Sequence, residues 1–339
     1  MSGTGAVTVV GAGAIGGYVA AKLCHAGVDV TVCDRNPEHL AAIKRSGLRV
    51  SGAADLLELV RAVDPEDLPQ ELSTVLLAVK TGATALALET IAPRLASGGC
   101  VVSLQNGLQE YLIADRIGLA RTVGAFLTFG GHYVGPGELA YAGPGSLRLG
   151  ELDGARTDRL DRLVALLSLA HPASATENIF GYLWSKTALG AFYFASALSD
   201  IDVQELIRSM PHRPALNRLV AEVAEVARAE GITCETIDGF SPEAYRSGDG
   251  GGIESSWEAQ LRYWDGHVQG RTGIWRDLAV HHRETEAAGI LLPVLDRAAR
   301  RGIPVPVLAA TARMVAEAEA GQRPLGPANL DELVSLAAT

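Results

Sequence analysis

Apolar positions in the first 150 residues form short β-branched runs separated by stretches with helical spacing. Several of these runs are continuously apolar, which is typical of strands buried on both faces of a parallel sheet. The stretches 17–25 and 37–46 have helical spacing and predict crossover helices. The runs lie at residues 6–10, 28–33, 74–79, 100–104 and 122–127. Strand, helix and strand in this order predict a doubly wound α/β domain of the Rossmann type.

The pattern changes near Thr176. Before it, the Gly-Pro punctuation of residues 133–151 predicts a hairpin that closes the first domain. After it, the spacing is helical almost throughout, interrupted by a glycine-rich stretch at 246–256 that predicts a flexible surface loop and a possible lid. We therefore predict a dinucleotide-binding domain over 1–176 and an all-α substrate and dimerisation domain over 177–339.

Composition narrows the class of protein. The 339 residues are 48% hydrophobic, which is ample for two domains, and the net charge of −10 argues against nucleic acid as a partner. The first basic residue, Lys22, follows the uncharged N-terminal stretch instead of preceding it, so we expect neither a signal sequence nor a membrane span. Four scattered cysteines fit a reducing compartment, and a cytoplasmic location is expected. No metal-binding motif is present, so no metal is predicted.

A glycine motif marks the candidate cofactor site. Gly11, Gly13 and Gly16 have G-x-G-x-x-G spacing directly after a predicted strand and at the start of a predicted helix. In such motifs the first glycine permits a tight turn, the second lets the backbone approach a pyrophosphate, and the third lets helix and strand pack closely. Ala14 and Ile15 begin the helix, whose N-terminus favours phosphate. These five residues predict a dinucleotide site.

The end of the second predicted strand bears on the choice of dinucleotide. Asp34 is the residue type that binds the ribose hydroxyls of NAD(H), whereas Arg35 is the type that pairs with the 2′-phosphate of NADP(H). Asp34 could instead cap the turn before Pro37 and leave Arg35 to reach the ligand. We favour this second interpretation and therefore NADP(H), with NAD(H) as the alternative.

Five short motifs in order give the chain a family resemblance. They are GAGAIGGYVAAKL (11–23), VLLAVKTGAT (75–84), VVSLQNGLQ (101–109), WSK (184–186) and HHRETEAAG (281–289). Together they resemble the ketopantoate reductase (2-dehydropantoate 2-reductase) family over almost the whole chain. The resemblance implies a Rossmann domain joined to a helical domain, with the active site between them.

The resemblance also implies roles for single residues. Lys80 matches the family's cofactor-side lysine, and Asn106 matches the asparagine beside the nicotinamide and the substrate. Lys186 matches the general acid, and Glu286 matches the glutamate that contacts the substrate. An ammonium group can both stabilise the charge that develops on a carbonyl oxygen and protonate it, so the set suits hydride reduction of a ketone. Glu284 remains a competitor for the place of Glu286.

Two further predictions concern the late motif. His282 and Glu286 are spaced i, i+4, which on a helix would allow an acid/base pair at the site or an ordinary surface pair. Aromatic residues between 257 and 275 are expected in the core of the helical domain, with some of them possible as a roof over an apolar substrate.

The chain also departs from the family pattern. Gly190 and Phe194 stand where the family has asparagines one and two turns after the catalytic lysine. Thr272 or Gly273 replaces the serine before the late helix, and Ala83 replaces a glutamine. Such a site loses hydrogen bonds and gains apolar surface, so the expected substrate is larger or more apolar than ketopantoate.

The sequence therefore predicts an NAD(P)H-dependent reductase of a 2-oxo acid-like or larger carbonyl compound. Reduction of an imine on the same scaffold is one alternative. A catalytically weak NADP-binding sensor or interaction protein is another; the lost asparagines favour it, and the retained Lys186 and Asn106 argue against it. A homodimer is expected because apolar helix faces such as that of residues 215–227 often pair two protomers.

Overall fold

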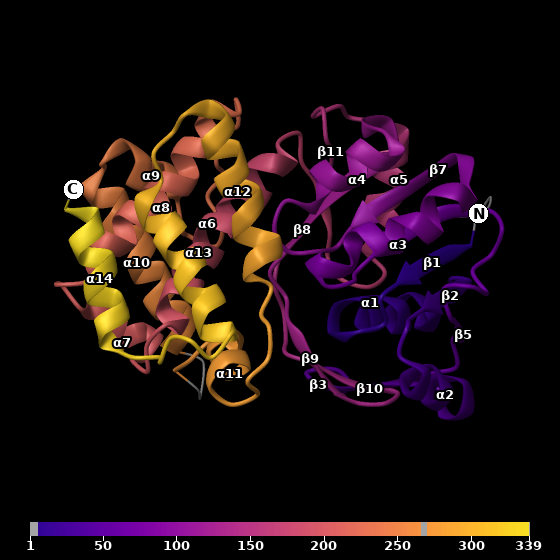
Figure 1. Cartoon of the computed structure of the whole chain (residues 1–339). Coiled ribbons are helices and arrows are strands. Elements are labelled where there is room, and N and C mark those ends of the chain that lie inside the picture. The colour runs from indigo at the N-terminus through magenta and orange to yellow at the C-terminus, as the bar shows by residue number, and fades with distance from the viewer. Residues whose placement is uncertain (1–5, 266–269, 339) are drawn as a thin grey trace. The chain divides into compact units, whose positions relative to one another are not determined.

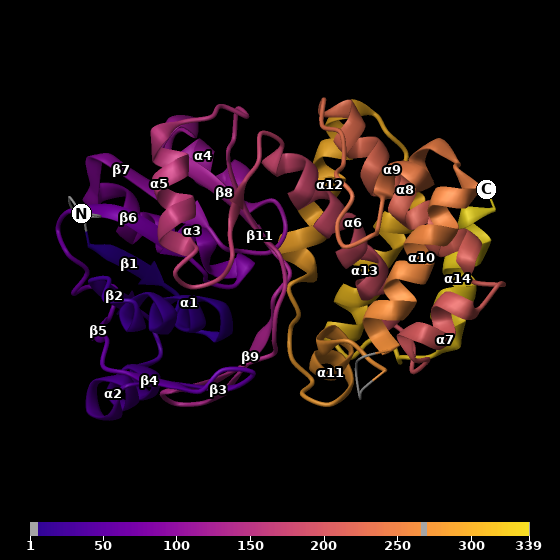
Figure 2. The same ribbon diagram turned by 180° about the vertical axis from the view of Figure 1, so that it is seen from behind.

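A computed structural model describes residues 6–265 and 270–338 of the chain. The chain separates into two compact units, Met1–Ile179 and Phe180–Thr339 (Figure 1). Unit 1 carries the sheets, and unit 2 is helical in its described residues; Figure 2 shows the same elements from behind. The α/β domain followed by an all-α domain is the fold class predicted from the sequence.

Unit 1 begins with the strand–turn–helix that the glycine motif predicted. Its strands are β1 (Val7–Val10), β2 (Val30–Cys33), β3 (Leu48–Gly52), β4 (Leu56–Glu58), β5 (Arg61–Val63), β6 (Leu72–Leu77), β7 (Leu95–Ser103), β8 (Thr122–Leu127), β9 (Gly131–Gly135), β10 (Glu138–Tyr141), β11 (Leu147–Glu151) and β12 (Ser174–Ala175). Its helices are α1 (Ala14–His25), α2 (Pro37–Ser46), α3 (Thr84–Ile91), α4 (Gln109–Ile117) and α5 (Asp158–Leu167).

The main sheet reverses its strand order at β1. Within the described residues its order is β12-β11-β8-β7-β6-β1-β2-β5. β1 pairs in parallel with β2 on one side and with β6 on the other, whereas β11 is antiparallel to β8. Ligands of open α/β sheets bind outside the carboxyl ends of the strands at such a switch point. The fold therefore places the ends of β1, β2, β6 and β7 where a dinucleotide site is expected.

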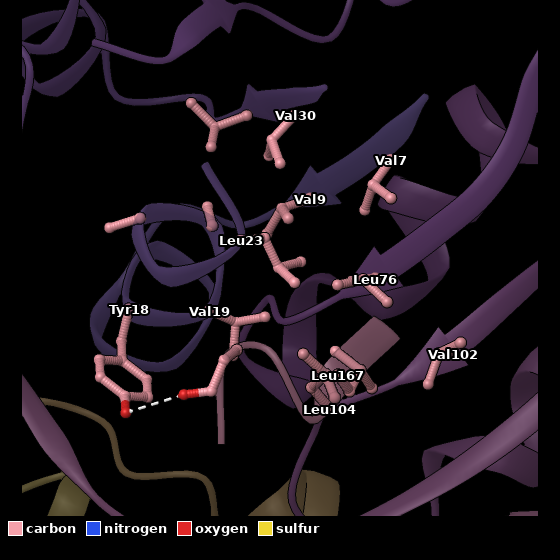
Figure 3. Close-up of a cluster of buried hydrophobic side chains, with 14 of the residues drawn as sticks. Val7, Val9, Tyr18, Val19, Leu23, Val30, Leu76, Val102, Leu104 and Leu167 are labelled. Atoms are coloured by element: carbon pink, nitrogen blue, oxygen red, sulfur yellow. Dashed lines mark hydrogen bonds between the residues drawn. The ribbon is translucent and has the colours of Figure 1, made fainter. Parts of the chain in front are cut away.

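Both faces of the main sheet are buried, which explains its continuously apolar strands. Val7 and Val9 of β1 belong to one cluster, which includes residues of α1 and α5, and Figure 3 shows part of that cluster. In the same view the hydroxyl of Tyr18 donates to the carbonyl oxygen of Ala170 at 3.2 Å. Val10 points to the opposite cluster, which includes residues of α3 and α4. Successive residues of one strand thus pack on opposite layers of helices.

The helix α2 forms over the range that the sequence predicted, and its two ends show why. The side chain of Asn36 accepts hydrogen bonds from the backbone N–H groups of Glu38 and His39, and Pro37 occupies the first helical position. Gly47 ends the helix at a positive φ of 83°, where a side chain would be strained. These local signals fix both ends without any distant partner.

A second, smaller sheet packs against α1. In the described residues its order is β4-β3-β10-β9, with β10 antiparallel to β9 and parallel to β3. The hairpin predicted over 133–151 is therefore divided, since β9 and β10 form a hairpin here and β11 joins the main sheet. Gly17 of α1 allows the contact, because a Cβ at this position would overlap Leu139 of β10.

Unit 2 is built from helices in its described residues. They are α6 (Ile179–Ala197), α7 (Val203–Arg208), α8 (Arg213–Ala229), α9 (Pro242–Ser247), α10 (Gly250–Asp265), α11 (Gly273–Ala279), α12 (Ala287–Arg301), α13 (Pro306–Glu319) and α14 (Pro327–Ala337). The largest buried side chains of unit 2 include Trp184 and Trp257. Trp257 contacts Phe192 and Tyr245 edge to face and is buried with Trp264 in an aromatic core, as expected. The prediction fails for two other aromatic residues of this region, because Tyr263 is 51% exposed and Trp275 is half-buried under the Arg271 guanidinium.

The apolar face of α8 is covered within unit 2. Leu216, Leu219, Val220 and Val223 are almost completely buried in the single chain. α8 contacts α9, α12, α13 and α14. The face at residues 215–227 is therefore no reason to expect a homodimer, and the expected dimer would need another surface.

The glycine-rich stretch 246–256 is not the surface loop that its composition predicted. It contains the end of α9 and the beginning of α10, whose first residue is Gly250. Gly248 adopts a left-handed conformation that ends α9, and the carboxylate of Asp249 accepts the N–H of Gly251 in the first turn of α10. The end of α9 and the start of α10 are only two residues apart. The glycines and Asp249 at this junction give the stretch the composition of a loop.

The described residues contain neither a membrane-spanning helix nor a cluster of metal ligands. No described helix is both long and apolar enough to cross a membrane. No group of three or more His, Cys, Asp or Glu side chains lies in an arrangement that could hold a metal ion within the described parts of the chain.

Candidate functional site

The turn between β1 and α1 requires two of its three motif glycines for packing. Gly11 has a φ of +96°, and a Cβ there would lie 2.8 Å from the carbonyl carbon of Ala78. Its N–H donates to the carbonyl oxygen of Cys33 at 2.8 Å, which ties the turn to the end of β2. A Cβ on Gly16 would overlap the carbonyl oxygen of Gly11. The first and third glycines therefore have the roles that the motif assigns to them.

Gly13 differs because the packing of the protein does not require it. No heavy atom lies within 4 Å of the position that its Cβ would take. It is the N-cap residue of α1 but offers no side-chain cap, and the first turn of α1 holds no acidic residue. The half-buried Ala14 and Ile15 follow it. Open space at an uncapped helix N-terminus fits a phosphate group, because the first N–H groups and the helix dipole attract an anion.

Asp34 is held by the backbone around it. One carboxylate oxygen accepts the N–H of Ala12 at 2.8 Å, and the other accepts the N–H of Asn36 at 2.9 Å. Arg35 is exposed beside it. This geometry matches the interpretation in which Asp34 stabilises the turn and Arg35 remains available to a ligand.

His39, which no sequence motif indicated, also contacts the glycine turn. The ring is buried, with one nitrogen 2.9 Å from the carbonyl oxygen of Ala12 and the other accepting the N–H of Gly137 at 2.9 Å. The ring of Tyr133 lies edge-on to the His39 ring, with 5.2 Å between the two ring centroids. Burial, followed by the carboxylates of Asp34 and Glu38, raises the pKa of the Tyr133 phenol. No local pattern could have revealed this cluster, because Ala12 and Gly137 lie 27 and 98 positions from His39 along the chain.

Lys80 and Asn106 follow neighbouring parallel strands, β6 and β7. Both side chains are exposed at the carboxyl end of the sheet. Gln105, which the sequence also did not mark as a site residue, joins their loops. Its buried amide nitrogen lies 2.8 Å from the carbonyl oxygen of Val79 and 2.8 Å from the hydroxyl of Thr84. The fold therefore brings the predicted Lys80 and Asn106 to one edge of unit 1 and ties their loops together.

Lys186 lies on the half-buried stripe of α6 in unit 2. Tyr182, Gly190 and Tyr193 share this stripe at helical spacing, and a Cβ on Gly190 would meet no atom within 4 Å. Phe194 is only 2% exposed and belongs to the core. Phe194 therefore packs in the core of unit 2, whereas the half-buried residue that follows Gly190 at helical spacing is Tyr193.

Tyr193 is part of a hydrogen-bonded cluster. Its hydroxyl donates to the side-chain oxygen of Gln260 at 2.7 Å and accepts the indole N–H of Trp264 at 3.2 Å. Burial raises the pKa of the phenol. The hydroxyl is therefore a neutral, fixed group.

The late motif is not helical, which corrects the predicted i, i+4 pair. α11 ends at Ala279 and α12 begins at Ala287, and His282 between them has a positive φ of 47°. The N–H of Arg283 donates to the carbonyl oxygen of Asp277, and its side chain pairs with the Asp277 carboxylate at 2.7 Å. These contacts hold the segment in an open turn, so His282 and Glu286 do not share a helix face.

The two candidate glutamates of this segment differ in exposure. Glu286 is half-buried at the N-cap position of α12, whereas Glu284 is exposed. Thr285 between them is held by Glu319, which accepts its backbone N–H at 2.7 Å. Thr272, expected in place of the family's serine, caps α11 by accepting the N–H of Trp275 at 3.1 Å, so this hydroxyl already serves the fold.

Comparison with known proteins gives consistent matches over both units. The sequence profile of ketopantoate reductase PanE/ApbA matches residues 7–154, and the profile of the C-terminal region of ketopantoate reductase PanE/ApbA matches residues 178–319. A 2-dehydropantoate 2-reductase of Halobacterium salinarum is 27% identical over 316 residues, covering 91% of this chain and 97% of the relative. One from Archaeoglobus fulgidus is 32% identical over 222 residues, covering 64% of this chain and 71% of the relative.

Solved structures share the fold. A PanE/ApbA family ketopantoate reductase from Ralstonia eutropha superposes with a TM-score of 0.78 at 26% identity, covering 94% of this chain and 99% of the other. D-mandelate dehydrogenase in a ternary structure with NADH and anilino(oxo)acetate superposes with a TM-score of 0.80 at 20% identity, with the same coverage.

Proposed function

Because the chain belongs to the ketopantoate reductase PanE/ApbA family and is an oxidoreductase acting on CH–OH groups, we propose that it reduces the ketone of a 2-oxo acid-like compound larger or more apolar than ketopantoate. The observation that carries the reductase proposal is the turn at 11–16, whose middle glycine leaves open space for a dinucleotide at an uncapped helix N-terminus; the substrate class rests on α6. That turn suits the pyrophosphate of a nicotinamide dinucleotide.

The cofactor proposed is NADP(H). Support comes from Asp34, whose two oxygens accept backbone N–H groups, and from the exposed guanidinium of Arg35 beside it. A guanidinium matches the geometry of a phosphate, so it would hold the 2′-phosphate that only NADP(H) carries. Replacing Arg35 with Ala should weaken NADPH binding by about tenfold or more and leave NADH binding unchanged. Equal effects on both dinucleotides would contradict this preference.

The reaction needs a hydride on the carbonyl carbon and a proton on the carbonyl oxygen. The nicotinamide supplies the hydride when it is bound. Lys186 is proposed as the general acid that protonates the oxygen, and Asn106 is proposed to orient the carbonyl group. Glu286 is proposed to hold the remaining polar end of the substrate, with His282 as a further contact; Lys80 is proposed to contact the cofactor.

The half-buried stripe of α6 supports the proposed substrate class. Where the family pattern has an asparagine, Gly190 contributes no side chain and leaves open space beside Lys186. The aromatic ring of Tyr193 lies on the same stripe, and its hydroxyl is held by Gln260 and Trp264 of α10. A site with more room and fewer amides loses affinity for the small polar end of ketopantoate and gains it for an apolar group.

Oxidation of NADPH in the presence of a panel of 2-oxo acids tests the proposal. The panel contains ketopantoate and acids with branched or aromatic side chains, and turnover is followed by nicotinamide absorbance. Lys186→Ala should lower kcat by about a hundredfold or more. Lys44→Ala removes an exposed lysine of α2 and serves as the matched control. Undiminished turnover in Lys186→Ala would refute its role, and binding of NADPH without turnover on any carbonyl compound would favour a sensor.

A further inference from the structure

Both polar backbone atoms of Ala12, the residue between Gly11 and Gly13, are held by side chains. Its N–H donates to the carboxylate of Asp34 at 2.8 Å, and its carbonyl oxygen lies 2.9 Å from Nε2 of His39. Both partners come from the segment that begins at the end of β2 and enters α2. Side-chain hydrogen bonds therefore hold the centre of the glycine motif, in addition to the backbone conformations that its glycines allow.

The tautomer of His39 follows from its two neighbours. Gly137 donates its N–H to Nδ1 at 2.9 Å, so Nδ1 is the acceptor. Nε2 therefore carries the hydrogen and donates it to Ala12. His39 is 2% exposed, and both of its ring nitrogens have hydrogen-bond partners, as a buried polar group requires. His39 thus connects the glycine turn to the turn between β9 and β10.

The contact with Ala12 bears directly on the phosphate-binding backbone. The peptide unit between Ala12 and Gly13 is planar and trans, so its C=O and its N–H point in opposite directions. When His39 holds the carbonyl oxygen, the orientation of the Gly13 N–H is set on the other side of that plane. The space that a Cβ of Gly13 would occupy is open, so an anion can approach the backbone at this residue.

We propose that His39 is a positioning residue for the cofactor: by holding the Ala12 carbonyl, it aims the Gly13 N–H at the pyrophosphate. The inference rests on the proposed nicotinamide cofactor and makes a different prediction from the one for Arg35. The pyrophosphate is common to both dinucleotides, so loss of His39 should weaken NADPH and NADH by the same factor, whereas Arg35 should affect NADPH alone.

Three variants and one control test this role. His39→Leu has similar bulk and no donor, whereas His39→Gln is long enough to keep an N–H donor near Ala12, and His39→Asn is too short. His25→Leu removes an exposed histidine at the end of α1, where it pairs with Glu58, and serves as the matched control. Dissociation constants for NADPH and NADH are measured by fluorescence titration without substrate, together with kcat at saturating cofactor and urea unfolding.

The expected result for His39→Leu is about a tenfold increase in both dissociation constants, with kcat within about twofold of the parent. His39→Gln should recover most of the affinity, and His25→Leu should bind normally. Should His39→Leu fail to fold, the comparison of His39→Gln with His39→Asn gives the same reading.

Folded His39→Leu with parental affinity, an effect confined to NADPH, or equal affinities of the Gln and Asn variants would overturn the proposal. A parent chain that binds neither dinucleotide would overturn both this inference and the proposed function. Dinucleotide binding without turnover on any substrate would overturn the proposed function alone, because the His39 titrations need no substrate.

Discussion

The side-chain amide of Gln105 donates to the carbonyl oxygen of Val79 at 2.8 Å, which joins the loop that carries Asn106 to the loop that carries Lys80. The same nitrogen lies 2.8 Å from the hydroxyl of Thr84, which in turn donates to the carbonyl oxygen of Thr81. Two loops that follow different strands are thus held in register at the edge where the cofactor is proposed to bind.

Replacing Gln105 with Leu should therefore disturb both function and stability. We expect the free energy of unfolding to fall by about 1–3 kcal/mol, because buried partners lose their donor, and kcat/KM to fall by about tenfold as the two loops separate. Urea unfolding and steady-state kinetics measure the two effects. Gln322→Leu, at an exposed position, is the control; a Gln105→Leu enzyme with parental kinetics would show that the loops need no tie.

The motif glycines allow packing and binding to be separated. Gly16→Ala places a Cβ against the carbonyl oxygen of Gly11 and 2.9 Å from the Cβ of Ala78, so it should lower the free energy of unfolding by about 1–3 kcal/mol or more. Gly13→Ala meets no atom within 4 Å, so its stability should match the parent. Its NADPH affinity should nevertheless fall by about tenfold, because the methyl group enters the space proposed for phosphate. Normal NADPH binding by Gly13→Ala would show that the phosphate does not occupy that space.

Substitutions at Gly190 in α6 test the proposed substrate class. Gly190→Asn restores the amide of the family pattern and should raise the preference for ketopantoate over bulky 2-oxo acids by about tenfold. Gly190→Ala is the matched control, since it fills part of the space without adding an amide. It should unfold with up to about 1 kcal/mol greater stability, because alanine is the better helix former and its methyl group meets no atom. An unchanged substrate preference in Gly190→Asn would show that residue 190 does not contact the substrate.

The buried Glu222 predicts a pH dependence of stability in unit 2. Its oxygens accept the N–H groups of Val307 and Leu308 at the start of α13, and it pairs with Arg218. Burial raises the pKa of the carboxyl group above its ordinary value of 4.5, against the opposing effects of Leu308 and Arg218. The folded chain thus keeps this proton to a higher pH than the unfolded chain does.

Unfolding therefore releases this proton between the two pKa values, and the stability contributed by Glu222 falls as the pH rises through that window. Glu222→Gln cannot titrate. The free energy of unfolding of the parent minus that of Glu222→Gln should be largest in acid, decline above pH 4.5 and level off at the raised pKa. A free-energy difference that increases with pH would show that folding lowers the pKa of Glu222 instead of raising it.

Local signals predicted much of the fold. The cap at Asn36, Pro37 and the glycine after Ser46 were enough to place α2, and continuous apolar runs located the central strands. The second sheet was not predicted, because β10 pairs with β3 from a distant part of the chain and the strands are short. The break at His282 was missed for a related reason, since helical spacing continues through a turn that contacts with Asp277 hold open.

The candidate site shows the same division. The glycines and Asp34 were predicted because a motif of fixed spacing carries them. His39 and Gln105 were not, because their partners, Gly137 and Val79, come from other strands and loops. A buried polar side chain in a sequence does not reveal which distant backbone atom it holds.

We propose that this member of the ketopantoate reductase family prefers a 2-oxo acid that is larger or more apolar than ketopantoate. The most direct test is the ratio of kcat/KM for ketopantoate to that for the best 2-oxo acid with a branched or aromatic side chain, measured with NADPH. We predict that the bulky acid is preferred by about tenfold or more. A kcat/KM for ketopantoate equal to or above that of every alternative would contradict the claim.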